Sequence, residues 1–499
     1  MITPVRSAQW RSLLARLLVF LVPSFLQGPK AREMIRPAKL SPTAYLDGVR
    51  GLAALFVFFC HYSYQAFRIA FSWGCEDDNW SWLKLPILRL WYQGPMAVSI
   101  FYVISGYALS YRAMKLARAR SWPDFWNSVS SLVFRRGIRL YLPTAISTLI
   151  IVFLLRIGAY DWNRDFANDK TYMKNVVEPH PLRMDSSYDQ LVDWLKHLFD
   201  FIHVYDWERY KTTASYDVHL WTIPTEFRCS LYLFIAIVGT ARLKTWARFL
   251  TIISATLFTF GNSRWDMLLF FCGMMLAEYD HIRGAHLAPP LPLPPPATST
   301  SDHYYSSSSS SSSDDEYDED AQLEKPSAAT ALDPRRRNLM PYVWGALSVV
   351  ALYLLSFPDD KGDITPGWRL LTAAIPSWWA ATRFRYWQSI GAVLFLFVVG
   401  HSPRWQRLFE TAPVQYLGKI SYALYIMHGP VMHTLGYSWE RLAYAITGTE
   451  GYWFNAGFTL GACFAVPTVV WVADIFWRAV DMPSVRFAKW LENKWLAKD

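Results

Sequence analysis

The sequence predicts an all-α protein: a polytopic transmembrane helical bundle of about ten spans with a disordered cytosolic insert. Three observations predict this fold class. Of the 499 residues, 53% are hydrophobic and only 18% are charged, whereas a soluble chain of this length is usually more charged. Several apolar stretches approach or exceed the ~20 residues that cross a bilayer as a helix. Basic residues gather in particular loops, which is typical of membrane orientation rather than nucleic-acid binding.

The first 43 residues are expected to form a cytosolic leader. Residues 13–27 are apolar, but this stretch is short and is interrupted by Pro23. No convincing signal-peptide cleavage site follows it. We favour an interfacial helix here, and a signal-anchor helix is the alternative.

The stretch 44–480 is expected to form the membrane domain, because it holds ten apolar segments. Their approximate ranges are 48–70, 93–111, 139–157, 228–241, 247–261, 265–279, 339–357, 386–401, 413–433 and 453–477. The segment 228–241 is the weakest of them. An eleventh candidate, 367–381, contains Pro376 and three tryptophans, and we assign it to the membrane interface.

The distribution of lysine and arginine predicts the orientation. The leader, the loop between the second and third spans, and the tail at 481–499 are all basic, so both termini are expected in the cytosol. Ten spans put the tail there, whereas an eleventh would put it outside. The first external loop holds the only glycosylation sequon, at 79–81. Together with the insert, this sequon favours an endomembrane location.

The stretch 284–338 interrupts the apolar pattern with APPLPLPPP, eight consecutive serines and the acidic run DDEYDED. Because this composition cannot bury apolar area, we expect a disordered linker between a six-span half and a four-span half. A tolerated insert is the favoured interpretation, and regulation by serine phosphorylation is the alternative. The five cysteines show no ligand-like spacing, so neither a disulfide framework nor a metal site is expected.

Arg50 and His61 lie eleven residues apart in the first span. In a helix this spacing puts both side chains on one face, about 16 Å apart along the axis. Ionisable residues on one face of a membrane helix are costly and indicate a functional site. His61 suits general base catalysis and Arg50 suits phosphate binding, at a separation that an extended pantetheine arm would cover. The structural alternatives are a His61 bonded to a neighbouring helix and an Arg50 paired with Asp47.

Further polar residues complete the candidate site. Arg136 and Arg139 share a helix face and are expected to help clamp the phosphates of CoA, although orienting positive charge would also explain them. Glu226 lies where the chain re-enters the bilayer, and it is expected to orient His61 or to bind the acceptor hydroxyl. His428 is interpreted as a structural histidine.

Five segments between residues 45 and 428 carry recognisable motifs in a fixed order. They are YLDGVRGLAALFVFFCH at 45–61, FYVISGY at 101–107, Arg136-x-x-Arg139 with Pro143, Leu220-Trp221 with Glu226, and LGKISYALYIMH at 417–428. In residues and order they resemble the motifs of the integral-membrane acyltransferase family called type 3, which includes acetylases of O-antigen and peptidoglycan. Pro224 and the large insert depart from that pattern, and we expect no extracellular hydrolase-like domain after the bundle, unlike in some relatives.

The resemblance implies about ten spans, an acyl-CoA donor that is usually acetyl-CoA, and a hydroxyl acceptor. It implies catalysis by His61 with support from Glu226, and donor binding by Arg50, Arg136 and Arg139. We therefore predict a membrane O-acyltransferase acting on a glycan, a lipid or a small metabolite, with no metal and no nucleic-acid partner. A proton-coupled transporter that uses His61 and Glu226 is the main alternative. A nonenzymatic membrane scaffold is the second.

Overall fold

The computed structural model describes residues 15–28, 40–77, 79–203, 215–285, 334–379 and 382–496, with the backbone alone for 334–338. Within these ranges the chain forms helices and loops and no strand, so the prediction of an all-helical fold is confirmed there. The low-complexity part of the predicted insert, with its serine and acidic runs, lies outside the described residues.

Each of the ten predicted apolar segments coincides with a helix. These helices are α3 (Ala44–Tyr64), α4 (Gly94–Arg118), α5 (Trp122–Arg156), α8 (Thr222–Thr240), α9 (Thr245–Gly261), α10 (Trp265–Ile282), α11 (Pro334–Leu355), α13 (Arg383–His401), α15 (Ala412–Val431) and α17 (Gly451–Phe476). Among the described residues, four helical stretches are long and apolar enough to cross a bilayer: Ala44–Tyr64, Trp122–Arg156, Val218–Thr240 and Gly451–Trp495. The full number of crossings stays a prediction.

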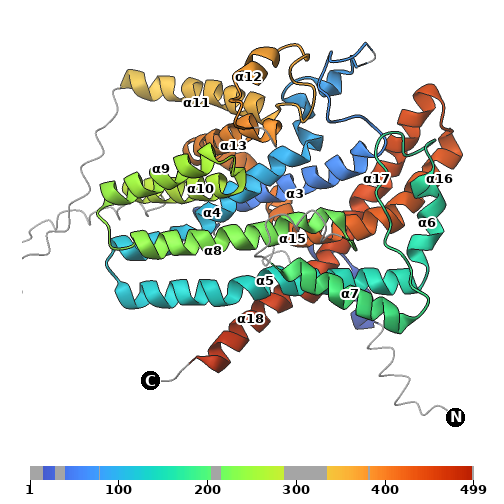
Figure 1. Cartoon of the computed structure of the whole chain (residues 1–499), viewed down its shortest axis with the longest axis horizontal. Helices are drawn as coiled ribbons and strands as arrows, with labels where there is room; N and C mark the ends of the chain where they lie inside the picture. The colour runs from blue at the N-terminus through green and yellow to red at the C-terminus, as the bar shows by residue number, and fades with distance from the viewer. Residues whose placement is uncertain are drawn as a thin grey trace, which may run out of the picture.

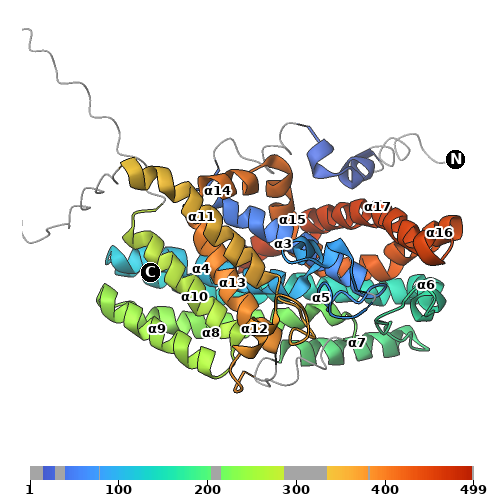
Figure 2. The same cartoon turned by 90° about the horizontal axis from the view of Figure 1, so that it is seen from above.

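The helix α3 occupies the centre of the bundle and packs against α15 and α4 (Figures 1 and 2). The approach of α3 to α15 is close because glycines meet there. A Cβ atom on Gly51 would lie 2.3 Å from the backbone nitrogen of Gly418. Small residues at such crossings are typical of membrane helices, because contact between backbones replaces the hydrophobic effect as a driving force. This crossing brings the polar residues of α15 beside Arg50 and His61.

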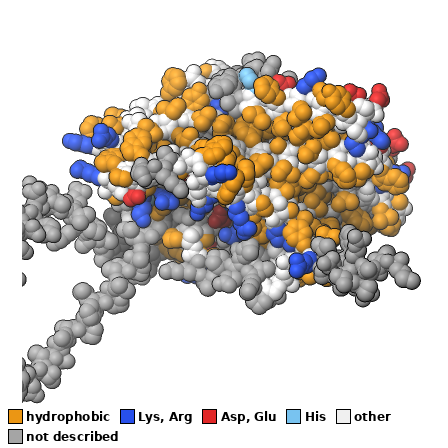
Figure 3. Space-filling model, turned by 90° about the horizontal axis from the view of Figure 1, so that it is seen from below, with side chains coloured by type: hydrophobic (Ala, Val, Ile, Leu, Met, Phe, Trp, Pro, Cys, Tyr) orange, Lys and Arg blue, Asp and Glu red, His pale blue; other side chains and the backbone are white. Residues whose placement is uncertain are grey.

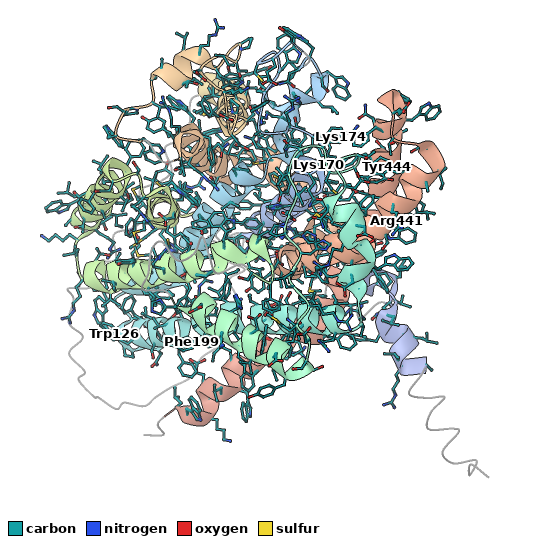
Figure 4. The ribbon with its side chains drawn as sticks, turned by 45° about the vertical axis from the view of Figure 1, so that its right-hand side comes forward. Trp126, Lys170, Lys174, Phe199, Arg441 and Tyr444 are labelled. Atoms are coloured by element: carbon teal, nitrogen blue, oxygen red, sulfur yellow. The ribbon has the colours of Figure 1, made fainter. Side chains whose placement is uncertain are left out.

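Several helices outside the predicted spans surround this centre. They are α6 (Ala159–Asn168), α7 (Ser187–Ile202), α12 (Arg369–Ala373), α14 (Pro403–Phe409), α16 (Tyr437–Thr447) and α18 (Met482–Trp495). The segment 367–381 holds only the short α12, followed by turns up to residue 379. The helix α7 is amphipathic and carries Phe199 on its outer face (Figure 4). In the leader, residues 15–21 are helical, and Ser24 hydrogen-bonds Asp474 of α17.

The surface of the bundle is apolar over a wide area. Figure 3 shows hydrophobic side chains across one face, with lysine and arginine at the left end, along the lower middle and at the right end, and acidic side chains mainly toward the right end. The left end in Figure 1 holds the turns after α4 and α8. These positions agree with the basic loops that the sequence assigns to the cytosol.

Candidate active site

A cavity of about 530 Å³ lies among α3, α4, α5, α8, α15 and α18. Its wall combines apolar side chains, such as Phe101 and Ile223, with charged ones. Four of the five predicted site residues line it, namely Arg50, Arg136, Arg139 and Glu226. We call this site the arginine cavity. Arg50, which lies far from Arg136 and Arg139 in the sequence, therefore lines the same cavity as they do.

Arg136 and Glu226 join α5 to α8 inside this cavity. Arg136 Nη2 lies 2.6 Å from Glu226 Oε1, and Arg136 Nε donates a hydrogen bond to Ser230 Oγ at 2.9 Å. Ser105 Oγ donates to the same oxygen of Glu226 at 2.9 Å. Because both charges are largely removed from solvent, each needs the other as a partner. Pro224 does not disturb the pair, since it lies in the first turn of α8, where a helix tolerates proline.

Glu226 therefore lies apart from His61, and no contact between these two side chains occurs among the described residues. The physical reason is that Arg136 and Ser105 occupy the Glu226 carboxylate. The carboxylate beside His61 is that of Glu178, whose Oε1 lies 3.8 Å from His61 Nδ1. The catalytic contribution expected of Glu226 stays a prediction.

The other two arginines differ in how firmly they are held. Arg50 donates hydrogen bonds to Asp47 Oδ1 and to Ser421 Oγ, both at 3.0 Å, so the pairing with Asp47 that the sequence offered as an alternative does form. Arg139 is exposed and makes no ion pair with any residue that the structure describes. Arg139 can therefore turn toward an anionic ligand without breaking a described ion pair, although the carboxylate of Asp481 lies close enough to act on it.

His61 lies at the other end of α3 within a group of imidazoles. Its ring centroid is 4.1 Å from that of His219 and 5.3 Å from that of His428. His219 belongs to the short helix η5 (Val218–Trp221). His428, which was expected to be structural, is buried on α15, and its Nδ1 lies 2.5 Å from the carbonyl oxygen of Tyr425. We call His61, His219, His428 and His433, together with Glu178, the histidine cluster.

Glu178 is the acidic centre of this cluster. It lies in the loop between α6 and α7 and is 5% exposed. Its Oε1 is 2.9 Å from His219 Nε2 and its Oε2 is 2.8 Å from His433 Nε2. Burial raises the pKa of Glu178, but the two imidazoles outweigh burial and hold the pKa well below its usual range. Glu178 is therefore an ionised carboxylate in a buried position.

The arginine cavity and the histidine cluster are neighbours, with Tyr425 between them. Tyr425 and Thr222 line the cavity, and their hydroxyl oxygens are 2.5 Å apart. The Tyr425 hydroxyl also donates to the carbonyl oxygen of His219 at 2.5 Å. The Tyr425 ring lies 5.7 Å from the ring of His428. His61 itself is not among the residues that line the cavity.

Sequence reasoning did not identify Glu178, His219 or His433. His219 opens the segment that contains Glu226, and an ionisable residue at that place was a usable signal. Glu178 had no comparable signal, because an acidic residue in an external loop is usually solvated. Its position beside His61 depends on how the loop folds back over the bundle, which helical spacing does not reveal.

Two trios of side chains among the described residues have the geometry to hold a metal ion. They are His61, His219 and His428, and Glu178, His219 and His433, with ligand atoms within 4.8 Å of one another in each trio. Imidazole and carboxylate are ligand types that suit zinc. The expectation that no metal is needed therefore stays a prediction.

The chain belongs to the type 3 acyltransferase family, because residues 43–478 match the acyltransferase domain of that family. It is 30% identical to the O-acetyltransferase PaAT-1 of Phomopsis amygdali, over 96% of this chain and 89% of that protein. It is 23% identical to acyltransferase R4 of a Phoma species, over 90% and 95% of the two chains, and 24% identical to acyltransferase clz18 of Cochliobolus lunatus, over 88% and 94%. No solved structure matches this chain. Its enzymatic class is that of an acyltransferase.

Proposed function

We propose that this protein is a membrane O-acyltransferase that moves a short acyl group, acetyl being the first choice, from acyl-CoA to a hydroxyl group. The acceptor is a glycan, a lipid or a small metabolite. The observation that carries the proposal is that Tyr425 joins the arginine cavity to the histidine cluster: it lines the cavity, and its ring lies 5.7 Å from that of His428. The name of the relative from Phomopsis amygdali supports acetyl as the transferred group.

The donor would bind through its phosphates at the arginine cavity. Arg50, Arg136 and Arg139 supply guanidinium groups there, and guanidinium binds phosphate through paired hydrogen bonds. Arg139 makes the strongest case for a ligand-binding role, because it is exposed and without an ion pair among the described residues. In this proposal Glu226 acts through Arg136 and keeps its guanidinium directed into the cavity.

The chemistry would take place at His61. Its imidazole removes the proton of the acceptor hydroxyl as the oxygen attacks the thioester carbonyl. The tetrahedral intermediate then collapses, the carbon–sulfur bond breaks, and the proton passes from His61 to the thiolate of CoA. The acyl group remains on the acceptor as an ester. For this route the acyl end of the donor must pass Tyr425, so we infer that this side chain moves when the donor enters.

The membrane arrangement is part of the same proposal. Ten spans place both termini and the arginine cavity on the cytosolic side, where acyl-CoA is available, and the endomembrane system is the location. The basic side chains at the left end of Figure 3 support this orientation.

The experiment uses membranes that contain the full chain, labelled acetyl-CoA and three alcohols: a methyl glucoside, a fatty alcohol and a sterol. Mass spectrometry detects acetyl esters, and a thiol reagent detects released CoA. The wild type is expected to form an ester with at least one alcohol and to release CoA in equal amount. The His61→Ala variant, expressed and folded to the same level, is expected to do neither. Normal transfer by His61→Ala would contradict the proposal.

A further inference from the structure

We propose that Glu178 is the positioning residue for His61: its carboxylate holds the imidazole with the proton on Nδ1, so that Nε2 is left to accept the proton of the acceptor. This inference rests on the proposed function, in which His61 is the base. It assigns the orienting role to a loop residue that the sequence analysis did not consider, instead of to Glu226.

His61 Nδ1 is buried and has no hydrogen-bond partner among the described residues. An unpartnered buried nitrogen is costly, and it needs an acceptor within reach when it carries a proton. Glu178 Oε1, at 3.8 Å, is the carboxylate oxygen that faces it. The distance is about 1 Å longer than a hydrogen bond, and catalytic hydrogen bonds often tighten only when substrate binds.

The carboxylate of Glu178 is firmly held. Besides the two imidazoles already described, Tyr64 Oη donates to Oε1 and Gln65 Nε2 donates to Oε2 at 3.2 Å. Tyr64 is the last residue of α3, one turn after His61, and Gln65 follows it directly. A buried carboxylate with several donors keeps one orientation, as a group that orients a catalytic base must. Tyr64, His219 and His61 all face Oε1, so a shorter contact from His61 Nδ1 would share this oxygen with the tyrosine and with His219.

The loop that carries Glu178 is attached to the rest of the bundle at two places. Asn175 fixes it to the end of α3: its backbone nitrogen donates to the carbonyl oxygen of Gln65 at 2.8 Å, and its side chain donates to that of Tyr64 at 2.6 Å. The ammonium group of Lys174 lies 3.3 Å from the centre of the Phe454 ring. Figure 4 shows Lys174 near Tyr444, on the end of the bundle formed by α6, α16 and α17. The loop is thus attached both to the helix of His61 and to α17.

Several titratable groups surround His61. The titratable side chains that face it are Tyr64 on its own helix, His219 on η5, His428 on α15, His433 on the π-helix η6 (Met432–Gly436) and Glu178 on the loop. Glu178 is the only carboxylate among them. Asp217 lies beyond His219, with Oδ1 2.6 Å from His219 Nδ1, and Glu226 is bound by Arg136.

The test compares Glu178→Gln and Glu178→Asp with the wild type, using labelled acetyl-CoA and the alcohol that the wild type acetylates fastest. We expect Glu178→Gln to lower kcat by roughly 100-fold or more, because the imidazole loses the group that fixes its tautomer. The KM for acetyl-CoA should stay within about twofold, since the arginine cavity is unchanged. Glu178→Asp keeps the charge and should recover part of kcat. A merely structural role would not separate kcat from KM in this way.

The matched control is Glu440→Gln. Glu440 is also 5% exposed and lies on α16 at the same end of the bundle, and burial raises its pKa to about 8. It is therefore largely protonated near neutral pH, and glutamine should replace it with little change in kcat. Size-exclusion chromatography of a fluorescent fusion establishes that each variant is folded. Glu178→Asp serves as the test variant if Glu178→Gln does not fold, with kcat reduced at unchanged KM as the expected result.

Three outcomes overturn the inference. A folded Glu178→Gln enzyme with wild-type kcat shows that His61 needs no orientation by this carboxylate, while loss of activity in His61→Ala would still uphold the proposed function. One equivalent of tightly bound metal in the wild type that is absent from Glu178→Gln shows that Glu178 is a ligand instead. Wild-type membranes that acetylate no alcohol overturn the proposed function and this inference together.

Discussion

The two ends of the candidate site are built in opposite ways. The arginine cavity takes its charged residues mainly from long helices, at short helical spacings such as that of Arg136 and Arg139, and Arg50 and Arg139 are partly or largely exposed. The histidine cluster is buried except for His61, whose side chain is 25% exposed, and it collects residues from two helices, a loop and two short helical segments. If the proposed function holds, the difference teaches that the part binding a charged, soluble donor is open, whereas the part performing the chemistry is largely enclosed, where hydrogen bonds are stronger.

The largest expected effect of a change at the open end follows removal of Arg136. Arg136→Gln leaves Glu226 without its guanidinium and takes one cation from the cavity. We expect the KM for acetyl-CoA to rise roughly 100-fold, with about 3 kcal/mol lost from the free energy of unfolding. Steady-state kinetics and thermal unfolding in detergent measure the two effects. The double variant Arg136→Gln/Glu226→Gln should regain stability but not donor affinity. A normal KM in the single variant would remove Arg136 from the donor site.

A substitution at Asp217, which contacts His219 of the histidine cluster, should change kcat alone. Asp217→Asn weakens the contact that orients His219, and through it the contact with Glu178. We expect kcat to fall about 10- to 100-fold, as when an outer partner of a site histidine is removed, with the KM for acetyl-CoA unchanged. Asp169→Asn, an exposed acid at the same end of the bundle, is the control. Equal kcat for both variants would show that the cluster works without Asp217.

Arg139 allows a cleaner test of the open end than Arg136. Because Arg139 has no ion pair among the described residues, Arg139→Ala should leave the melting temperature unchanged and raise the KM for acetyl-CoA about 10-fold. The effect should shrink as salt is added, since salt screens exposed charges. An unchanged KM at low salt would mean that Arg139 contributes membrane orientation only.

The smallest expected effect is a pH dependence of stability at the enclosed end. Burial first, and then His433, lower the pKa of His180 to about 3. The neutral imidazole therefore stabilises the fold fully above pH ~6.5, its unfolded pKa, and this stability is lost as pH falls toward 3. Between pH 7 and pH 4.5 the melting temperature of His180→Asn should fall less than that of the wild type. Parallel curves would contradict this account of His180.

Much of the fold and half of the site could be predicted from the sequence. Apolar segments and basic loops located ten helices, because length and hydropathy are local properties. The arginines could be identified for the same reason, since Arg136 and Arg139 are close in the sequence and lie at the start of a predicted span. The short helices α6, α7 and α16 were not predicted, because they are amphipathic or polar and fall within stretches read as loops.

The histidine cluster could not be assembled from the sequence. His61 was identified from its spacing to Arg50, but its partners depend on tertiary contacts. The loop at 169–186 has no periodic pattern, so nothing local indicates that Glu178 folds back onto the end of α3. Glu226 was expected to orient His61 or to bind the acceptor hydroxyl, because a carboxylate where the chain re-enters the bilayer needs a partner. In the structure the guanidinium of Arg136 is that partner.

The central claim is that donor binding and chemistry occupy different ends of one site, and the most direct test is donor binding by an enzyme without its base. Purified His61→Ala is titrated with labelled acetyl-CoA, and its turnover is measured in the same sample. The account predicts a Kd within about twofold of the wild-type value and no ester formed. A His61→Ala protein that fails to bind acetyl-CoA while folded, or one that still forms ester at the wild-type rate, would contradict it.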